Sequence, residues 1–275
     1  MWIYPSMARQ LNFSTIKNME RWEVALNKFL IPWRKNKEVV GALVCGSFVM
    51  GNPTKHSDID LHIALSEKAK WRERGNKIVD GFLIEYFANP PRQIIEYFKE
   101  DYSNGKQMAI TQFITGRIIF DDGSIKQLKE EAKKWRSEKI VKPPKISNEL
   151  NKYAIWDMSD NLQDCLDKKD ADFWFVYHNF IAGLIQHYCK FVGYPAIKDY
   201  KAFDIFTKEK TRKKYLLPKF PDKVFSNLIV KAFVANDKDK AMLIYKKISN
   251  HLLKQMGGFN INGWKIKSPV SYMKP

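Results

Sequence analysis

Cysteine is scarce in this sequence. The 275 residues include three cysteines, Cys45, Cys165 and Cys189, which lie far apart and are odd in number. No Cys-x-x-Cys pair occurs and the five histidines are scattered, so the sequence predicts neither a disulfide framework nor a structural zinc site. Cys45 lies in an apolar run, where we expect a small buried hydrophobic residue without a disulfide partner.

Long hydrophobic runs and a secretion signal are also lacking. The uncharged stretch of residues 39–53 has about a dozen apolar positions, whereas a membrane-spanning helix needs roughly 20. Residues 1–5 include neither a basic segment nor a small-residue cleavage site. We therefore expect a cytoplasmic protein with no membrane partner.

Acidic residues are too few to balance the basic ones. Lys and Arg number 47 against 30 for Asp and Glu, which leaves a formal net charge of +17. Residues 141–275 have 24 basic and 13 acidic side chains, so the second half of the chain carries most of the excess. Its densest basic patch, residues 198–223, includes Lys208, Lys210, Arg212, Lys213 and Lys214. Such a patch attracts a nucleoside triphosphate, RNA or an anionic surface, although a solvated lysine-rich surface has the same pattern.

A Gly-Ser pair followed by two aspartates is the most informative motif. Gly46-Ser47 ends one apolar run, and Asp58-Ile59-Asp60 begins the next. Alternate side chains of an extended strand share a face, so Asp58 and Asp60 project together. Two adjacent carboxylates repel each other unless a cation lies between them, and Mg2+ binds such oxygens while taking further ligands from substrate phosphates. The motif therefore predicts a metal site beside a turn that phosphates can approach.

The same segment does not form a Walker loop. Gly46 and Gly51 have the required Gly-x-x-x-x-Gly spacing, but Asn52 and Pro53 stand where the loop needs Lys and then Ser or Thr. A P-loop is therefore excluded.

A third carboxylate follows on a predicted hairpin. An Asp-Gly turn joins two apolar runs, residues 76–79 and 82–87, which is a strong hairpin signal. In the second run Glu85 shares a face with Leu83 and Phe87, and we predict that this face is buried. A lone acid there is unfavourable unless it is paired or binds a metal. Glu85 is therefore the candidate for a third metal-site acid, and pairing with one of the many lysines is the alternative.

These residues together resemble the signature of the nucleotidyltransferase superfamily, the fold shared by DNA polymerase beta and the antibiotic nucleotidyltransferases. Its pattern is Gly-Ser, a short spacer, Asp-hydrophobic-Asp and a third acid on a later strand, and the match is specific over residues 39–87. The resemblance implies that Asp58, Asp60 and Glu85 are the catalytic residues and metal ligands for two Mg2+ ions. Glu85 is then either a metal ligand or the base for the attacking hydroxyl. The resemblance also implies that nucleotide is bound by Gly46, Ser47, Lys55 and Ser57.

The resemblance and the apolar periodicity predict an α+β protein with two domains. An N-terminal nucleotidyltransferase domain, residues 1–142, has a mixed β-sheet flanked by helices. Pro143-Pro144 precedes an all-α helical-bundle domain for substrate binding, residues 145–275.

The expected elements follow from the periodicity and the turn residues. In the first domain we expect helices over 14–33, closed by Pro32, and over 66–75, 90–98 and 124–139. The expected strands are 38–46, 59–65, 76–79, 82–87 and 112–120. In the second domain we expect helices over 147–168, 171–192, 221–236 and 237–256.

One expected helix of the second domain has an acidic stripe. Asp157, Asp160, Asp164 and Asp167 recur at intervals of three and four residues, which places them on one face. Two interpretations stay open. Nearby lysines balance the stripe, or Asp157, Asp160 and Asp164 receive the amino groups of a cationic substrate, as acidic residues do in aminoglycoside-modifying enzymes.

The activity that the resemblance implies is Mg2+-dependent, adenylyltransferase-like transfer. A nucleoside monophosphate, AMP from the co-substrate ATP, moves to a hydroxyl of a small-molecule acceptor such as an aminoglycoside or lincosamide antibiotic, and pyrophosphate is released. The acidic stripe favours a cationic acceptor, whereas the net positive charge opposes its capture. Nucleotide addition to RNA is an alternative that the charge favours, although no aromatic-plus-basic RNA module is evident. Nucleotidylation or regulation of a protein partner, as in antitoxin-type nucleotidyltransferases, is a further alternative.

Overall fold

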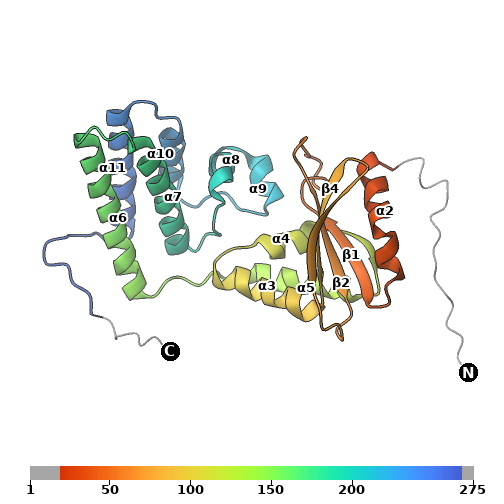
Figure 1. Cartoon of the computed structure of the whole chain (residues 1–275). Helices are drawn as coiled ribbons and strands as arrows, with labels where there is room; N and C mark the ends of the chain where they lie inside the picture. The colour runs from red at the N-terminus through yellow and green to blue at the C-terminus, as the bar shows by residue number, and fades with distance from the viewer. Residues whose placement is uncertain (1–18, 268–275) are drawn as a thin grey trace, which may run out of the picture. The chain divides into compact units, whose positions relative to one another are not determined.

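The structure is a computed structural model that describes residues 19–267 (Figure 1). These residues form two compact units, one of residues 19–99 and 108–136 and the other of residues 100–107 and 137–267. The sequence places the domain boundary at 142–145, a few residues after the main segment of the second unit begins. It did not predict that residues 100–107 belong with the second unit.

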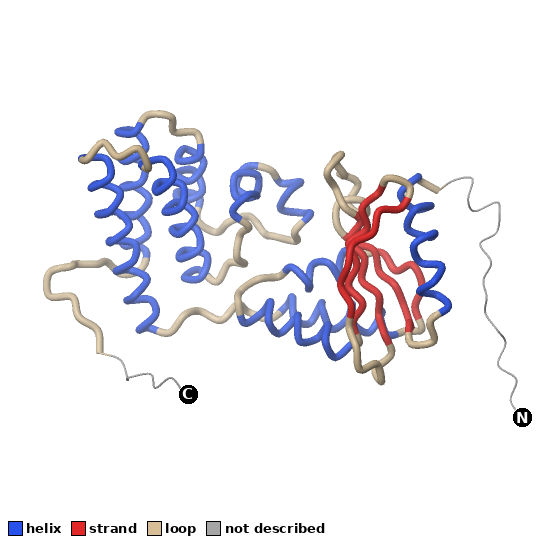
Figure 2. The backbone as a smooth tube through the Cα atoms, in the orientation of Figure 1, coloured by secondary structure: helices blue, strands red, loops and turns tan. Residues whose placement is uncertain are grey.

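The first unit is built on a five-stranded mixed sheet (Figure 2). The strand order is β3-β4-β2-β1-β5. β2 and β4 are parallel, and the other neighbours are antiparallel. The predicted mixed sheet is confirmed. The strands are β1 (Val39–Cys45), β2 (Ile59–Leu65), β3 (Glu73–Val79), β4 (Phe82–Asn89) and β5 (Arg117–Asp121).

Helices cover both faces of this sheet. α2 (Arg21–Lys35) packs Leu26 and Leu30 on one face, against residues such as Ile59 of β2 and Ile84 of β4. On the other face α3 (Pro91–Ser103), α4 (Met108–Thr115) and α5 (Ser124–Ser137) share a core with β1, β2 and β5 (Figure 1). β1, β2 and β5 alternate between these two cores, and this alternation positions the polar residues at the strand ends.

The predicted helix over 66–75 is wrong. Residues from Glu73 onward form the edge strand β3, which pairs along its whole length with β4. The charged sequence resembles an exposed helix, but an edge strand is also charged and polar because one side of it has no neighbour. Gly75 fits the strand because a Cβ there would lie 2.6 Å from the Tyr86 hydroxyl across the ladder.

The predicted strand over 112–120 is a helix followed by a strand. α4 ends at Thr115, and β5 starts at Arg117. Ile110 and Phe113, at helical spacing, are buried in the core. Gly116 makes the corner because a Cβ there would lie 2.4 Å from Leu43 Cδ2. Local apolar alternation did not distinguish the two forms, and packing against β1 selected the helix.

The first predicted helix also differs from the observed one. Its residues 14–18 lie outside the described residues. α2 continues through Pro32 to Lys35, so Pro32 does not end it. A proline so close to the C-terminus interrupts little of the helix, because few residues follow it.

The second unit consists of helices, as predicted. The long helices are α6 (Lys145–Asp167), α7 (Phe173–Val192), α10 (Lys223–Phe233) and α11 (Lys238–Gln255). Three short helices that the periodicity missed connect α7 to α10: η1 (Asp199–Lys201), α8 (Ala202–Thr207) and α9 (Glu209–Lys214). Aromatic side chains fill the core, among them Tyr177, Phe225 and Tyr245.

No helix within residues 19–267 is both long enough and apolar enough to span a bilayer.

Candidate metal and nucleotide site

Three carboxylates meet at one end of the sheet. Asp58, Asp60 and Glu85 each offer an oxygen, and these oxygens lie within 4.8 Å of one another. All three side chains are partly exposed. The sequence singled out these three residues, and the structure brings them together.

The strand register explains why they meet. Asp60 is the cross-strand neighbour of Glu85 in the parallel β2–β4 pair. Directly opposite residues lie on the same face of a sheet, so their carboxylates point to the same side. Asp58 lies two residues before Asp60, where β2 begins. The two motif segments are therefore joined by hydrogen bonding between strands that are distant in the sequence.

Gly46 makes room for the carboxylates. Its φ is +78°, a left-handed conformation that favours glycine. A Cβ at this position would lie 1.9 Å from Asp60 Oδ2, so every other residue would collide with that carboxylate. The glycine of the Gly-Ser pair thus lies directly against the acidic site.

The other predicted nucleotide-binding residues lie in the turn and loop after Gly46. The backbone N–H of Asn52 donates to the carbonyl of Ser47 at 3.1 Å, which closes the turn. The Ser57 hydroxyl accepts from the backbone N–H of Thr54 at 2.8 Å and stabilises the loop, and Lys55 is exposed. Contact of these side chains with nucleotide stays a prediction.

The buried Cys45 thiol responds to the negative charge of the site. Cys45 is fully buried, as expected, and pairs with Asp60 across β1 and β2. Burial raises the pKa of the Cys45 thiol well above its ordinary value, and the carboxylates of Asp60 and Asp58 raise it further. The same field that disfavours a thiolate favours a cation.

The face that carries Glu85 is not buried, which corrects the prediction. Leu83 on that face is 42% exposed, and Ile78 opposite it on β3 is 72% exposed. The buried side is the opposite one, where Ile84 contacts the α2 core. Among the described residues, the hydrophobic core that α3 to α5 share with the sheet draws on β1, β2 and β5 and on no residue of β3 or β4. Burial therefore does not explain the acid at position 85.

Glu85 has a cationic partner that the sequence reading missed. The Arg74 guanidinium Nη2 lies 2.8 Å from Glu85 Oε1. The alternative of a lysine partner was thus close, but the partner is an arginine. The Asp-Gly turn sets the hairpin register, and counting back from it places Arg74 opposite Phe87, diagonal to Glu85. The sequence therefore contained a signal for this contact.

His62 is a second residue that the sequence reading missed. It follows Asp60 by two positions on the same strand face, and its ring stacks on Phe87 at 5.5 Å between centroids. Burial lowers the pKa of His62 to about 4, although a contact between its Nε2 and Gln112 Oε1 at 3.3 Å acts in the opposite direction. His62 is therefore neutral at physiological pH, and it is a buried packing residue two positions after Asp60.

The acidic stripe of α6 is largely solvent-exposed. Asp160, Asp164 and Asp167 are exposed, and Asp157 is half-buried. Asp157 accepts from Asn161 Nδ2 at 3.1 Å, and Asp164 pairs with Lys168 at 2.6 Å. These partners come from the same helix and its C-cap residue, and a role in substrate binding stays a prediction.

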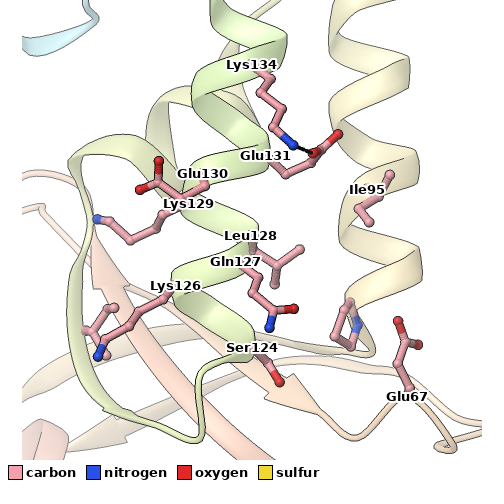
Figure 3. Close-up of a pocket in the computed structure, with 12 residues that line it drawn as sticks. Glu67, Ile95, Ser124, Lys126, Gln127, Leu128, Lys129, Glu130, Glu131 and Lys134 are labelled. Carbon is pink, nitrogen blue, oxygen red and sulfur yellow. Dashed lines mark hydrogen bonds and ion pairs between the residues drawn. The ribbon is translucent and has the colours of Figure 1, made fainter.

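A groove of about 700 Å³ lies elsewhere on the first unit, between α3 and α5 (Figure 3). Its lining includes Ile95, Leu128 and Lys129 but none of the three carboxylates. The Lys129 ammonium donates to the carbonyl of Gly116 at 2.6 Å and so provides a hydrogen-bond donor for the backbone just after α4. This side of the groove is thus structural.

The donor set fits a hard divalent cation. All the ligand atoms are carboxylate oxygens, which Mg2+ prefers, and they are close enough to share an ion. Gly46 has no Cβ that would collide with the Asp60 carboxylate.

A family model independently matches this region. The family of polymerase beta nucleotidyltransferases matches residues 30–80, a segment that contains Gly46, Asp58 and Asp60. This match makes the segment of the first unit that contains the Gly46 turn and the two aspartates similar to the polymerase beta nucleotidyltransferases.

Among solved structures, the crystal structure of a nucleotidyltransferase-like protein from Exiguobacterium sibiricum 255-15 is similar. The two chains share 10% sequence identity with a TM-score of 0.41, over 85% of this chain and 75% of the other. No curated protein matches this chain.

Proposed function

We propose that this protein is an enzyme that transfers AMP from ATP to a hydroxyl of a small-molecule acceptor. The observation that carries the proposal is the meeting of Asp58, Asp60 and Glu85, with oxygens within 4.8 Å, beside the Gly46 turn. That arrangement suits phosphoryl-type chemistry, in which positioning and charge stabilisation supply most of the rate.

The proposed reaction replaces a phosphoanhydride bond of the triphosphate with a phosphoester bond to the acceptor. The acceptor hydroxyl oxygen forms a bond to the α-phosphorus, and the bond from that phosphorus to the oxygen bridging to the β-phosphate breaks. Pyrophosphate leaves with the electron pair of the broken bond. The hydroxyl proton passes to Glu85 or to water. Two Mg2+ ions held by Asp58, Asp60 and Glu85 would neutralise the phosphates and the attacking and leaving oxygens.

The residues of this chain have distinct roles in the proposal. Asp60 holds its ligand oxygen on a strand whose backbone is paired on both sides, and Asp58 lies just before the start of that strand. Gly46 lets the phosphates approach the backbone without meeting a side chain. Ser47, Lys55 and Ser57 lie in the adjoining turn and loop, where they can contact those phosphates.

The proposed acceptor is an amino-bearing compound such as an aminoglycoside. The exposed carboxylates of Asp160 and Asp164 support it, because they would pair with amino groups. The net charge of +17 opposes it by repelling a polycation at long range.

RNA is the second candidate acceptor, and one observation favours it. Tyr200 is 74% exposed, and the ammonium groups of Lys198 and Lys201 lie 5.9 and 5.4 Å from its ring centroid. An exposed aromatic ring flanked by cations can stack a base while the lysines contact phosphates.

A transfer assay tests the proposal. The protein is incubated with Mg2+ and each labelled nucleoside triphosphate against aminoglycosides, lincosamides and tRNA, and pyrophosphate release and acceptor labelling are measured. We expect labelling of a small molecule from ATP. Labelling of tRNA alone would select the RNA alternative, and absence of pyrophosphate release with every acceptor would contradict the proposal.

A further inference from the structure

Arg74 contacts the carboxylate site from the edge strand of the sheet. Its guanidinium Nη2 lies 2.8 Å from Glu85 Oε1, while the Arg74 side chain is 71% exposed and that of Glu85 is 21% exposed. One oxygen of a candidate metal ligand is thus occupied by a cation of the protein itself. The contact is solvent-accessible, so its net contribution to stability is small.

Aromatic packing holds the guanidinium in this place. Arg74 Cζ lies 4.8 Å from the ring centroid of Phe87, its cross-strand neighbour on β4. Phe87 in turn stacks on the buried ring of His62. A planar guanidinium stacks on an aromatic face as well as pairing with an anion, so the stack directs Arg74 toward the carboxylates.

Arg74 and a divalent cation compete for Glu85. Both are positive, and both are attracted by the charge of the same three carboxylates. A guanidinium at hydrogen-bonding distance from one ligand repels a cation that the three ligands share. Arg74 therefore weakens binding of a metal ion that arrives alone.

An incoming triphosphate changes the balance. The guanidinium fork matches a phosphate group with two parallel hydrogen bonds, and its exposure leaves room to turn from Glu85 to such a ligand. Glu85 would then be released to the metal as Arg74 gains a phosphate.

We propose that Arg74 is a triphosphate-binding residue that pairs with Glu85 until metal and nucleotide bind, and then transfers its hydrogen bonds to a phosphate oxygen. This inference depends on the proposed function, because it takes the nucleoside triphosphate as the ligand. Metal binding and nucleotide binding then reinforce each other. A metal ion that takes Glu85 frees the Arg74 guanidinium for a phosphate, and a phosphate that takes Arg74 frees the Glu85 carboxylate for the metal.

The proposal predicts two effects of opposite sign when Arg74 is removed. Without nucleotide, Arg74→Ala binds Mn2+ about three- to tenfold more tightly, because the competing cation is gone. With Mg2+ present, the same variant binds a non-hydrolysable ATP analogue about tenfold more weakly, because a charge-assisted phosphate contact is lost. A residue that only supports the hairpin would weaken both.

The experiment compares Arg74→Ala with a matched control. Lys77→Ala removes the same charge from the same strand. Position 77 is an odd number of residues from position 74, so its side chain lies on the opposite face of the sheet. Mn2+ binding is followed by electron paramagnetic resonance, and analogue binding by calorimetry. Thermal unfolding checks the fold, and Arg74→Gln, which retains the length of the stem, repeats the test if the alanine variant does not fold.

Each outcome decides the matter. The two opposite shifts in the Arg74 variant, with neither in Lys77→Ala, support the proposal. If the wild-type protein binds both ligands, and the Arg74 variant either binds them equally well or binds Mn2+ more weakly, this inference alone is overturned. Wild-type protein that binds neither Mn2+ nor the analogue overturns the proposed function as well.

Discussion

At Gly46 the absence of a side chain is what gives Asp60 its position. Two requirements coincide there, a φ of +78° and a Cβ that would lie 1.9 Å from Asp60 Oδ2. Any other residue at this φ costs about 1–2 kcal/mol in backbone strain. Its Cβ would in addition displace the Asp60 carboxylate, which is a candidate metal ligand. The glycine is therefore needed for the site as well as for the turn.

We predict that Gly46→Ala loses metal binding, because the methyl group and Asp60 Oδ2 cannot occupy the same space. Gly51→Ala is the matched control, since Gly51 has a φ of +70° but a Cβ added there would meet no atom within 4 Å. Both variants should lose about 1–2 kcal/mol of unfolding free energy from the left-handed backbone. Mn2+ titration with thermal unfolding measures the difference, and equal metal affinities in the two variants would contradict the prediction.

Asp60→Asn should reduce turnover by at least about a hundredfold while the fold is retained, because the amide preserves shape but removes the charge that binds the cation. Pyrophosphate release measures the rate, and circular dichroism checks the fold. Asp239→Asn, an exposed residue in the first turn of α11, is the control for loss of one carboxylate. Normal turnover by the Asp60 variant would contradict the assignment of this site as the catalytic centre.

At the scale of elements, one carboxylate joins three helices of the second unit. Asp222 caps α10 by accepting from the Phe225 backbone N–H at 2.9 Å. It also accepts from the Tyr188 hydroxyl of α7 at 2.6 Å and lies 2.6 Å from His251 Nε2 of α11. Burial by itself raises the pKa of the Asp222 carboxyl, but the hydrogen bonds from Tyr188, His251 and Phe225 outweigh it and lower the pKa below its ordinary value.

The lowered pKa of Asp222 gives a pH dependence of stability. A carboxyl whose pKa is lower in the folded state stabilises the fold above its unfolded pKa, and that contribution disappears as pH falls through the folded value. The contribution of Asp222 is therefore complete at neutral pH and declines as pH falls below the ordinary value of 3.8. Asp222→Asn should flatten this acid limb in denaturation curves measured at a series of pH values.

Asp222→Asn should also lower the free energy of unfolding at neutral pH by about 1–3 kcal/mol, because Tyr188 and His251 lose a charged acceptor. Asp237→Asn is the matched control, since Asp237 caps α11 through the Lys240 backbone N–H alone and asparagine caps equally well. Urea unfolding at neutral pH compares the two. Equal small losses would show that Asp222 acts only as a cap.

The hairpin β3–β4 illustrates how far local reasoning extends. Asp80 and Gly81 have positive φ values of 49° and 84°, as the Asp-Gly pair of a two-residue hairpin turn requires. The turn sets the register, so the sequence implies that Arg74 lies opposite Phe87. Which face of the hairpin is covered does not follow from the turn, because it depends on where α3 to α5 pack.

For the molecule as a whole, charge and chemistry point to different ligands. A protein with a net charge of +17 should bind RNA weakly and without specificity at low salt, through release of counterions from phosphates. Such binding by itself is not evidence that RNA is the acceptor.

We therefore expect tRNA affinity to fall steeply between about 50 and 200 mM salt, with no transfer of nucleotide to tRNA at either concentration. Filter binding measures the affinity, and labelled ATP measures the transfer. Lys198→Ala with Lys201→Ala should reduce the salt dependence of tRNA binding, because both ammonium groups flank Tyr200. Salt-resistant labelling of tRNA would instead make RNA the acceptor.

Much of the architecture was predictable because the signals are local. Strand alternation paired Asp58 with Asp60, the Asp-Gly turn located the hairpin, and helical periodicity identified the long helices of the second unit. Residues 66–75 and 112–120 were assigned wrongly, since a charged edge strand resembles a charged helix and a short apolar helix resembles a strand. In both segments the pairing or packing partner, which is distant in the sequence, decided the form.

The sequence by itself determined the chemistry of the site: a glycine turn, two aspartates on one strand face and a third acid on a later strand. Turn geometry and strand alternation act over a few residues, so these features can be read from the chain. Only the tertiary structure decided that Asp60 and Glu85 lie side by side, that the face of Glu85 is open, and that Arg74 pairs with it. These outcomes depend on strand order and helix packing, where long-range contacts select one arrangement from several that satisfy the same local rules.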